Sequence, residues 1–496
     1  MTFTVERPVS QAQRPGLVLA GMSVCTALVV GFVAAINLAV PKLAASSLHP
    51  TSSGLLWIVD AYVVVFACLV IPAGAAGDKF GRKGTLLTGL GVFAVGAVFS
   101  AMAPSVPVML VGRAITGLGA ACVLPNCVGV LIHATAPQRR PHALAVWAAA
   151  TGIGGVVGNV GGGALLSIGS WRVLFVAVAI VAVCCLGWVA ACAPPSARHA
   201  RSLDPAGAVL FVAAVVALLT GIIEGPERGW GSAVVLVAFA CSLVLGLAWF
   251  LVELRVPHPM LDPRLFRNPS LSSAGIGMTV IFFGSFGLFY VNASLLQYGR
   301  GFTVLQAGLG IIPLTLPLLL GTRYVPGLIR HTGLPAVLVA AFLLVSAGLF
   351  GLSFTSAMPY PLYATALFVI GLGIMLAGPC LTAEIAAGLP VEQAGIAGGL
   401  QSATRELGSA LGVAVVGTVL TAGFTQHLPA SLSHHSPVPR TVAEALTLAP
   451  AERDAIAEAF ISGADTALRT AGVLTLIAGA LVVAGATRVR RDGATG

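Results

Sequence analysis

Long apolar runs separated by short polar segments follow one another along nearly the whole chain. A helix needs roughly 20 apolar residues to cross a bilayer core about 30 Å thick, so this pattern predicts fourteen membrane-spanning helices. Their approximate ranges are 17–40, 53–73, 85–103, 108–132, 143–168, 173–192, 206–223, 232–252, 271–296, 304–325, 334–354, 361–385, 396–420 and 467–486. The stretch from 361 to 420 is the least cleanly divided.

Composition places the chain in a membrane. Of its 496 residues, 57% are hydrophobic and 9% are charged, whereas soluble globular proteins carry about 25% charged residues. The 60 glycines suit helices that approach one another closely in lipid. The expected fold class is therefore an all-α polytopic membrane protein.

Lysine and arginine predict the orientation of the helices, because cytoplasmic loops keep an excess of both. With the N-terminus inside, sixteen of these residues fall in cytoplasmic segments and six in outer ones. Residues 1–16 and 488–496 are thus expected in the cytoplasm. Separately, the excess of arginine over lysine suggests a bacterial gene with GC-rich codons. The longest loop, 422–465, is then external. Within it, Ala449–Phe460 has the early proline and acids of a short surface helix.

Several functional classes are disfavoured. The net charge of +9 is scattered over short loops, which argues against a nucleic-acid surface. No Walker-type GxxxxGK[ST] sequence is present, which argues against an ATP-driven pump. The nine cysteines fall in apolar runs and the histidines lie in loops or at helix ends, so neither a metal site nor a cofactor is predicted. No set of catalytic residues points to an enzyme.

Asp60 is the most informative single residue. It lies in an otherwise apolar run, where a charge costs a few kcal/mol even on the gentler insertion scales. Asn37 and Arg113 are expected at the same depth, a few residues from the outer ends of their helices. The three side chains can then satisfy one another, either as a coupling element that opens when a proton or cation arrives or as a static pair that pins two helices together.

A glycine stripe in the fifth span predicts close helix packing. Gly154, Gly158 and Gly162 repeat at four-residue spacing, and Gly408 and Gly412 form a similar pair in the thirteenth span. If spans 1–6 and 9–14 are two related halves, these positions are equivalent, as in transporters that rock two repeats against each other. Ordinary close packing explains the stripe equally well.

Further charges lie within or near the later spans. Arg405 and Glu406 fall about ten residues into the thirteenth span and fit a buried pair or a cavity lining. Glu384 lies near the cytoplasmic end of the twelfth span, where it could reach water as a further cavity charge, although a structural role is favoured.

Five short motifs follow one another along the chain: Trp57–Tyr62, the turn Gly74–Lys83, Leu110–Gly119, Gly158–Gly163 and Glu224–Trp230. As an ordered set they resemble the major facilitator superfamily, specifically its fourteen-span drug:proton antiporter branch (EmrB/QacA type). The signature turn between spans 2 and 3 is similar to Gly74-Ala-Ala-Gly-Asp78-Lys-Phe-Gly81-Arg82-Lys83. The span 4 motif with a buried arginine is similar to Leu110–Gly119, and the span 5 antiporter motif to Gly158–Gly163. Trp57–Tyr62 resembles span 2 of quaternary-ammonium exporters, and Glu224–Trp230 the turn between spans 7 and 8.

The resemblance implies two pseudo-symmetric six-helix bundles with two inserted helices. The N-terminal half is expected over 17–192, the linker and inserted helices over 193–252, and the C-terminal half over 253–487. It also implies a cytoplasmic latch made by Asp78, Arg82 and Lys83, whose alternative is a solvated basic turn. The corresponding stretch of the second half, Gly327–Gly333, lacks the acid.

Three positions depart from the family pattern. The acid usual in span 1 is replaced by Phe32, the glutamine of span 4 by Thr116 and the proline of span 5 by Asn159. The loss of the span 1 acid places more of the coupling role on Asp60.

The sequence therefore predicts a monomeric exporter of the bacterial cytoplasmic membrane that exchanges a cationic or amphipathic drug or metabolite for protons. A proton-coupled importer of a nutrient and a membrane sensor that has lost transport are the alternatives.

Overall fold

The computed structural model describes residues 15–195, 204–257, 259, 262–356, 358–388 and 394–492. Residues 1–14, 196–203 and 493–496, which include most of the predicted cytoplasmic N-terminus, lie outside the described residues.

Helices make up the regular structure of the described chain. The first six are α1 (Pro15–Ala44), α2 (Ser52–Phe80), α3 (Arg82–Ala101), α4 (Val106–Ala134), α5 (Arg140–Ile168) and α6 (Trp171–Cys192). Two more follow, α7 (Pro205–Arg228) and α8 (Ala233–Glu253). The remainder are α9 (Pro269–Ser294), α10 (Val304–Leu309), α11 (Ile312–Gly321), α12 (Val325–Thr332), α13 (Leu334–Thr355), α14 (Tyr360–Ala387), α15 (Ala394–Gln426), α16 (Ala430–Ser433), α17 (Val442–Leu448) and α18 (Arg453–Asp492).

Fourteen helical segments match the fourteen predicted spans. Within the described residues, 13 are long and apolar enough to cross a membrane. The fourteenth is α5, which has 29 residues and contains the shorter apolar stretch Gly152–Ile168. In a bilayer the backbone must satisfy its own hydrogen bonds, which is why each apolar run becomes a helix. The prediction of an all-α polytopic membrane protein is confirmed.

The tenth span is broken rather than continuous. It consists of α10, α11, the 3-10 turn η4 (Thr322–Tyr324) and α12. Pro313 and Pro326 stand at the starts of α11 and α12, and Pro317 lies inside α11. Because proline lacks a backbone N–H and clashes with the preceding turn, three prolines in fourteen residues interrupt the helix.

The last span begins much earlier than its hydropathy predicts. α18 starts at Arg453 rather than near 467, so the surface helix expected at Ala449–Phe460 is mostly the first part of this span. The stretch is polar on one face, but Phe460 and Ala464 are buried on the other. Gly463 approaches Gly423 of α15 backbone to backbone. The segment between α15 and α18 is therefore 427–452, shorter than the predicted loop 422–465.

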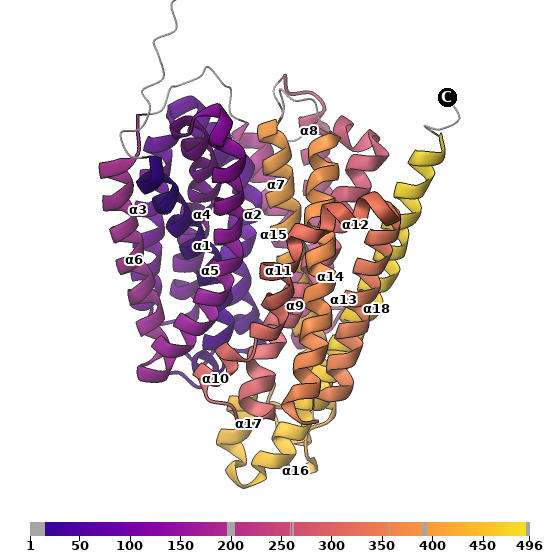
Figure 1. Cartoon of the computed structure of the whole chain (residues 1–496). Helices are drawn as coiled ribbons and strands as arrows, with labels where there is room; N and C mark the ends of the chain where they lie inside the picture. Colours follow the sequence, from indigo (N-terminus) through magenta and orange to yellow (C-terminus); the bar gives the residue numbers. More distant parts are fainter. Residues whose placement is uncertain are drawn as a thin grey trace, which may run out of the picture.

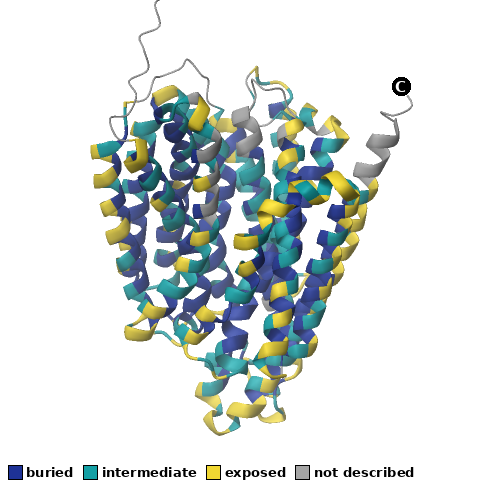
Figure 2. Ribbon diagram, in the orientation of Figure 1, coloured by how far each residue is buried: buried dark blue, intermediate teal, exposed yellow. Residues whose placement is uncertain are grey.

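The helices form two bundles with the same internal packing, seen as the indigo-to-magenta and the orange-to-yellow parts of Figure 1. α1 packs on α5 as α9 packs on α15, and α2 packs on α4 as α11 packs on α14. Likewise α3 packs on α4 and α6, while α13 packs on α14 and α18. Figure 2 shows buried residues concentrated inside the bundles and exposed ones around the rim. α7 and α8 pair with each other, and α7 touches both α2 and α15.

The two ends of the molecule differ. The end that carries α16 and α17, at the bottom of Figure 1, is called the cap end. The opposite end carries the turn between α2 and α3 with Arg82 and Lys83, and is called the basic end. A cavity of about 530 Å³ at the cap end is lined by Thr51 and Ser52 of the N-terminal bundle and by residues of the segment 435–448. The cap segment thus reaches across to the other bundle.

Candidate functional site

Asn37, Asp60 and Arg113 lie at one depth, about two turns from the cap-end termini of their helices. α1 ends at Ala44, α2 begins at Ser52 and α4 begins at Val106. At about 1.5 Å per residue, each residue is roughly 10–12 Å from its helix end. Asp60 and Arg113 are both 0% exposed, and Asn37 is also buried. The common depth matches the sequence prediction.

Arg113 bonds to the backbone of α2 rather than to the carboxylate of Asp60. Its Nε donates to the carbonyl of Ile58 at 2.7 Å and its Nη2 to that of Val59 at 3.2 Å. Its Nη1 has no hydrogen-bond partner among the described residues. The expectation that the acid, the arginine and the amide satisfy one another is therefore wrong for this conformation. The geometry arises because Asp60 is the next residue along α2, so Arg113 reaches its helix but not its side chain.

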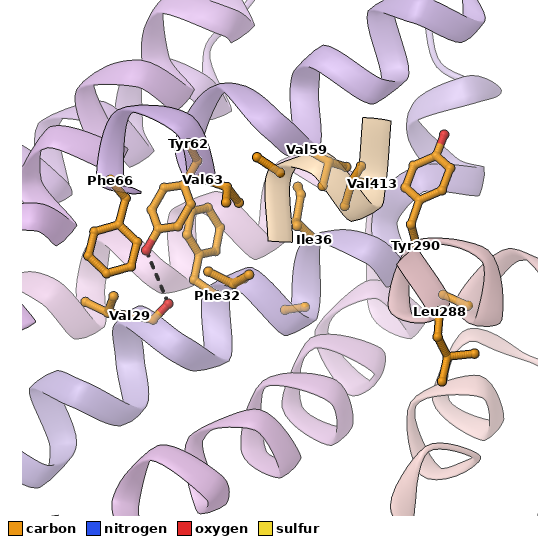
Figure 3. Packing of buried hydrophobic residues seen from close by; sticks show 14 of the residues in the cluster. Val29, Phe32, Ile36, Val59, Tyr62, Val63, Phe66, Leu288, Tyr290 and Val413 are labelled. Atoms are coloured by element: carbon orange, nitrogen blue, oxygen red, sulfur yellow. Dashed lines mark hydrogen bonds between the residues drawn. The ribbon is translucent and has the colours of Figure 1, made fainter. Parts of the chain in front are cut away.

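Two aromatic rings contact the guanidinium of Arg113 and take the place of a counter-ion. Its guanidinium carbon lies 4.9 Å from the ring centroid of Phe32 and 4.8 Å from that of Tyr62. Such cation–π contacts are strongest away from water. The Tyr62 hydroxyl donates to the carbonyl of Val29 at 3.3 Å, drawn as a dashed line in Figure 3. Phe32, the residue in place of the family's span 1 acid, thus contacts the arginine through its π face.

Asp60 is left as a buried acid without a partner. Neither carboxylate oxygen accepts a hydrogen bond from the described residues, and the same holds for Oδ1 of Asn37. The Asn37 amide donates to its own helix, to the carbonyl of Val33. A buried ionised carboxylate without a donor is costly, so this site favours a protonated Asp60 in this conformation.

Arg405 and Glu406 form a second charged group, on α15. Nε and Nη2 of Arg405 contact Oε1 of Glu406 at 2.7 and 2.6 Å. The Arg405 guanidinium also lies 5.8 Å from the Phe282 ring of α9. The two charges are paired, with Glu406 buried and Arg405 partly exposed, and the pair lies on the helix that packs on α2.

Glu384 has the structural contact that the sequence favoured. Its Oε2 accepts a hydrogen bond from the Ser270 hydroxyl at 2.8 Å, which ties α14 to the start of α9.

The signature turn makes its contacts inside the N-terminal bundle. Asp78 pairs with Arg82 at 2.7 Å, and the side chain of Arg82 lies against Gly129 of α4. Lys83 donates to the carbonyls of Ala190 and Ala193 at the end of α6. Gly81 adopts a φ of 100°, a conformation that glycine takes without strain. Gly74, by contrast, is in ordinary contact with Pro125 of α4.

Lys83→Met is expected to lower the stability of the folded protein by about 1–2 kcal/mol. The ammonium caps the last carbonyls of α6 and interacts favourably with the helix dipole. Lys79→Met removes the same charge from an exposed lysine and serves as the matched control. Thermal unfolding of the purified proteins in detergent measures both. Equal midpoints for the two variants would show that the cap contributes nothing.

The glycine stripe of α5 is in backbone contact with α1. A Cβ at Gly158 would lie 2.1 Å from the carbonyl oxygen of Gly31, and one at Gly154 would lie 2.7 Å from Cα of Ala27. Gly162 meets Ala35 in the same way. On the other bundle, a Cβ at Gly412 would lie 2.3 Å from the carbonyl oxygen of Phe283. The two stripes therefore play the same packing role, on α1 and on α9.

Two hydrogen bonds between the described parts of the bundles lie at the cap end. They come from η3 (Leu295–Gly299), a π-helical turn that continues α9. Gln297 donates to the carbonyl of Leu38 at 3.4 Å, and Tyr298 to that of Pro41 at 3.3 Å. The sequence analysis did not identify these residues. Their residue types and spacing match none of the motifs considered above.

Arg300 anchors this π-helical turn to its own bundle. Its guanidinium donates to the carbonyls of Thr355, the last residue of α13, and of Met358, each at 2.6 Å. Burial lowers the pKa of Arg300, yet a guanidinium remains charged at neutral pH. The turn is therefore fixed to the C-terminal bundle and bonded more weakly to the N-terminal one.

Comparison with known proteins gives a consistent result. The sequence profile of the Major Facilitator Superfamily matches residues 22–413. The multidrug resistance protein Stp of Mycobacterium tuberculosis (strain CDC 1551 / Oshkosh) is 30% identical over 88% of this chain and 80% of its own length. The methylenomycin A resistance protein of Streptomyces coelicolor is 31% identical over 80% of this chain and 85% of its own.

Among solved structures, a bacterial homologue of the human lysosomal transporter Spinster has the same fold. It superposes with a TM-score of 0.68 at 17% identity and covers 98% of this chain and 99% of the other. Among the described residues, no group of three or more His, Cys, Asp or Glu side chains is arranged to hold a metal ion.

Proposed function

We propose, from the premise that this chain belongs to the Major Facilitator Superfamily, that it exports a small drug or antibiotic in exchange for protons. The observation that carries the coupling is Asp60, a fully buried acid whose oxygens accept no hydrogen bond from the part of the chain that the structure describes. The substrate class is supported by relatives that are named for multidrug and methylenomycin resistance.

The basic end is proposed to face the cytoplasm, because basic residues concentrate on the cytoplasmic side of membrane proteins. The cap end then faces outward, and the bonds of Gln297 and Tyr298 to α1 close the outer side in this conformation. The substrate accordingly binds from the cytoplasm or the inner leaflet.

Asp60 and Arg113 are proposed to couple proton transfer to opening of the cap end. Protonated Asp60 needs no counter-ion, which is compatible with the backbone and ring contacts of Arg113 seen here. Loss of the proton leaves a charged carboxylate beside a guanidinium whose Nη1 bonds to none of the described residues. We expect an ion pair to form, which draws Arg113 towards Asp60 and away from the carbonyls of α2. Because Tyr62 contacts both Arg113 and the backbone of α1, that movement disturbs the packing of α1 against α2.

The glycine stripes are proposed to keep each bundle rigid while the two bundles rock. α5 packs on α1 through Gly158. The following residue, Asn159, lies with its backbone carbonyl against Gly308 of the C-terminal bundle. α5 is thus tight against its own bundle and in contact with the other at the cap end. The contacts of Asp78, Arg82 and Lys83 within the N-terminal bundle are compatible with a latch that is disengaged while the cytoplasmic side is accessible.

The driving force needs no nucleotide. One charge that crosses 100 mV supplies about 2.3 kcal/mol. The transported molecule is a small amphipath, the membrane protein is a monomer, and the membrane is the bacterial cytoplasmic membrane.

Everted membrane vesicles test the proposal. Respiration acidifies the vesicle lumen and quenches a pH-sensitive dye, and export of a substrate by proton antiport then restores the fluorescence. We expect dequenching by ethidium, a cation, or by chloramphenicol, a neutral amphipath, in vesicles that contain the protein. Vesicles without the protein are the control. Cells with the protein should contain less of the drug than cells without it if the protein is an exporter, and more if it is an importer. Binding of the drug without any flux would instead indicate a sensor.

A further inference from the structure

Glu406 is a second buried acid, and the coupling scheme above does not use it. Its side chain is 4% exposed, against 19% for its neighbour Arg405. Oε1 accepts both contacts from Arg405, whereas Oε2 is buried and has no hydrogen-bond partner among the described residues. One oxygen of this carboxyl is therefore stabilised by a cation and the other is free to carry a proton.

The surroundings of Glu406 contain few other charges. α15 packs against α2, α7, α9, α14 and α18. From α2, Asp60 and Tyr62 are titratable residues away from the helix ends, and the Tyr62 ring contacts the Arg113 guanidinium. From α9, the neighbour of the pair is the uncharged Phe282 ring. On the described parts of α7, α14 and α18, the charged residues towards the helix ends are Asp204, the N-cap of α7, and Glu224, Arg228, Glu384, Arg453, Asp454 and Glu458. Asp465 and Arg469 lie farther into α18, where they bond to Ser356 and Ser353 at the C-terminal end of α13.

The two buried acids stand on opposite bundles at different depths. Leu56 of α2 meets Gly417 of α15, which fixes the register of the two helices. Asp60 lies one turn, about 6 Å, towards the basic end from Leu56, and Glu406 lies about 16 Å towards it from Gly417. The stagger is roughly 10 Å along the helices, with Tyr62 at an intermediate level. The two buried acids thus lie on either side of the interface between the bundles, at two different depths in the membrane.

We propose that Glu406 is a second proton-carrying residue, so that two protons are exchanged for each substrate molecule. The inference rests on the proposed proton antiport. The proton is held on Oε2 and leaves to water on the cytoplasmic side, and the resulting carboxylate stays paired with Arg405. Asp60 controls opening of the cap end through Arg113, whereas Glu406 adds a proton to each cycle without being needed for opening.

Proteoliposomes with an internal pH dye and the transported probe, ethidium or chloramphenicol, measure the proton-to-substrate ratio directly. We expect two for the natural protein and one for Glu406→Gln, which keeps the shape of the side chain but cannot release a proton. At 100 mV each proton supports about a fifty-fold gradient, so Glu406→Gln lowers the limiting gradient about fifty-fold. Glu406→Asp is expected to keep a ratio of two. Glu384→Gln, a change at an acid bonded to Ser270, is the matched control.

A ratio of one in the natural protein, or an unchanged ratio in Glu406→Gln, would overturn the inference and leave antiport intact. If the natural protein moves the probe without protons, the proposed function itself fails, and the second proton site with it. Should Glu406→Gln fail to fold, proton release by the natural protein in detergent on addition of the probe decides the matter. Release of two protons per bound probe supports the inference, and release of one contradicts it.

Discussion

Asp60→Asn is expected to abolish proton-coupled export while the protein still folds and inserts. Asparagine resembles the protonated acid in shape and charge. Protonated Asp60 is the form that this site favours, because no described residue donates a hydrogen bond to its oxygens. The variant therefore remains in the conformation closed at the cap end. The substrate gradient in energised vesicles should fall to that of vesicles without the protein, a loss of about fifty-fold or more at 100 mV. Dye dequenching and probe accumulation measure it.

Two further variants show whether the carboxyl group itself is responsible. Asp60→Glu keeps a titrating group on α2 and is expected to retain part of the activity, with a changed pH profile. Glu384→Gln alters an acid that bonds to Ser270 and is expected to transport normally. Probe binding by Asp60→Asn in detergent should persist, because the side chain is fully buried. Normal proton-driven accumulation by Asp60→Asn would rule out the coupling role.

The membrane fold was largely predictable because hydropathy reports burial in lipid directly. Each of the fourteen apolar runs became a helical segment, since an unpaired backbone group in lipid costs several kcal/mol. The errors fell where hydropathy and packing diverge. The start of α18 is polar on one face only, and its buried face, with Phe460 and Ala464, continues the helix beyond the apolar run. The break in the tenth span depends on Pro317 and its neighbours rather than on hydropathy.

The site was predictable in its membership but not in its bonding. Sequence placed Asp60 and Arg113 at one depth because helix length fixes depth. It did not show which way the guanidinium points, since this depends on two ring faces and two carbonyls that the fold brings together. Phe32 was interpreted as a missing acid, whereas in the structure it is a cation–π partner of Arg113. An absent charge in a sequence does not reveal what replaces it.

The conformation links these local contacts to transport. Gln297 and Tyr298 hold the bundles together at the cap end through bonds to α1, and Tyr62 reaches the same helix through Val29. α1 therefore receives the contacts of the proposed outer closure and those of the Arg113 site. Any movement of Arg113 towards Asp60 acts on the helix that must part from α9. This arrangement requires α1 to move as one body with its own bundle, and that rigidity depends on α5.

Gly158→Ala is expected to disrupt the N-terminal bundle and to abolish transport. The added Cβ would lie 2.1 Å from the carbonyl oxygen of Gly31 and 2.5 Å from its Cα. Both are backbone atoms, so no side-chain rotation relieves the clash, and α1 and α5 must separate. Overpacking of this kind costs about 3 kcal/mol, at the upper end of the usual range. The unfolding midpoint in detergent and probe accumulation in vesicles both measure the effect.

The same helix provides matched controls. At Gly155 and Gly161 an added Cβ would meet nothing within 4 Å, so Gly155→Ala and Gly161→Ala are expected to fold and transport normally. These variants change the glycine content and the helix propensity of α5 as much as Gly158→Ala does, and they differ from it only in facing away from α1. If all three variants lost stability equally, the flexibility of α5 would be the cause. If none did, close contact between α1 and α5 would not be needed for the rocking cycle. A lower unfolding midpoint and lost accumulation in Gly158→Ala alone, with normal coupling in the controls, would support the proposed mechanism. In that mechanism, α1 must stay packed on α5 so that deprotonation of Asp60 can open the cap end.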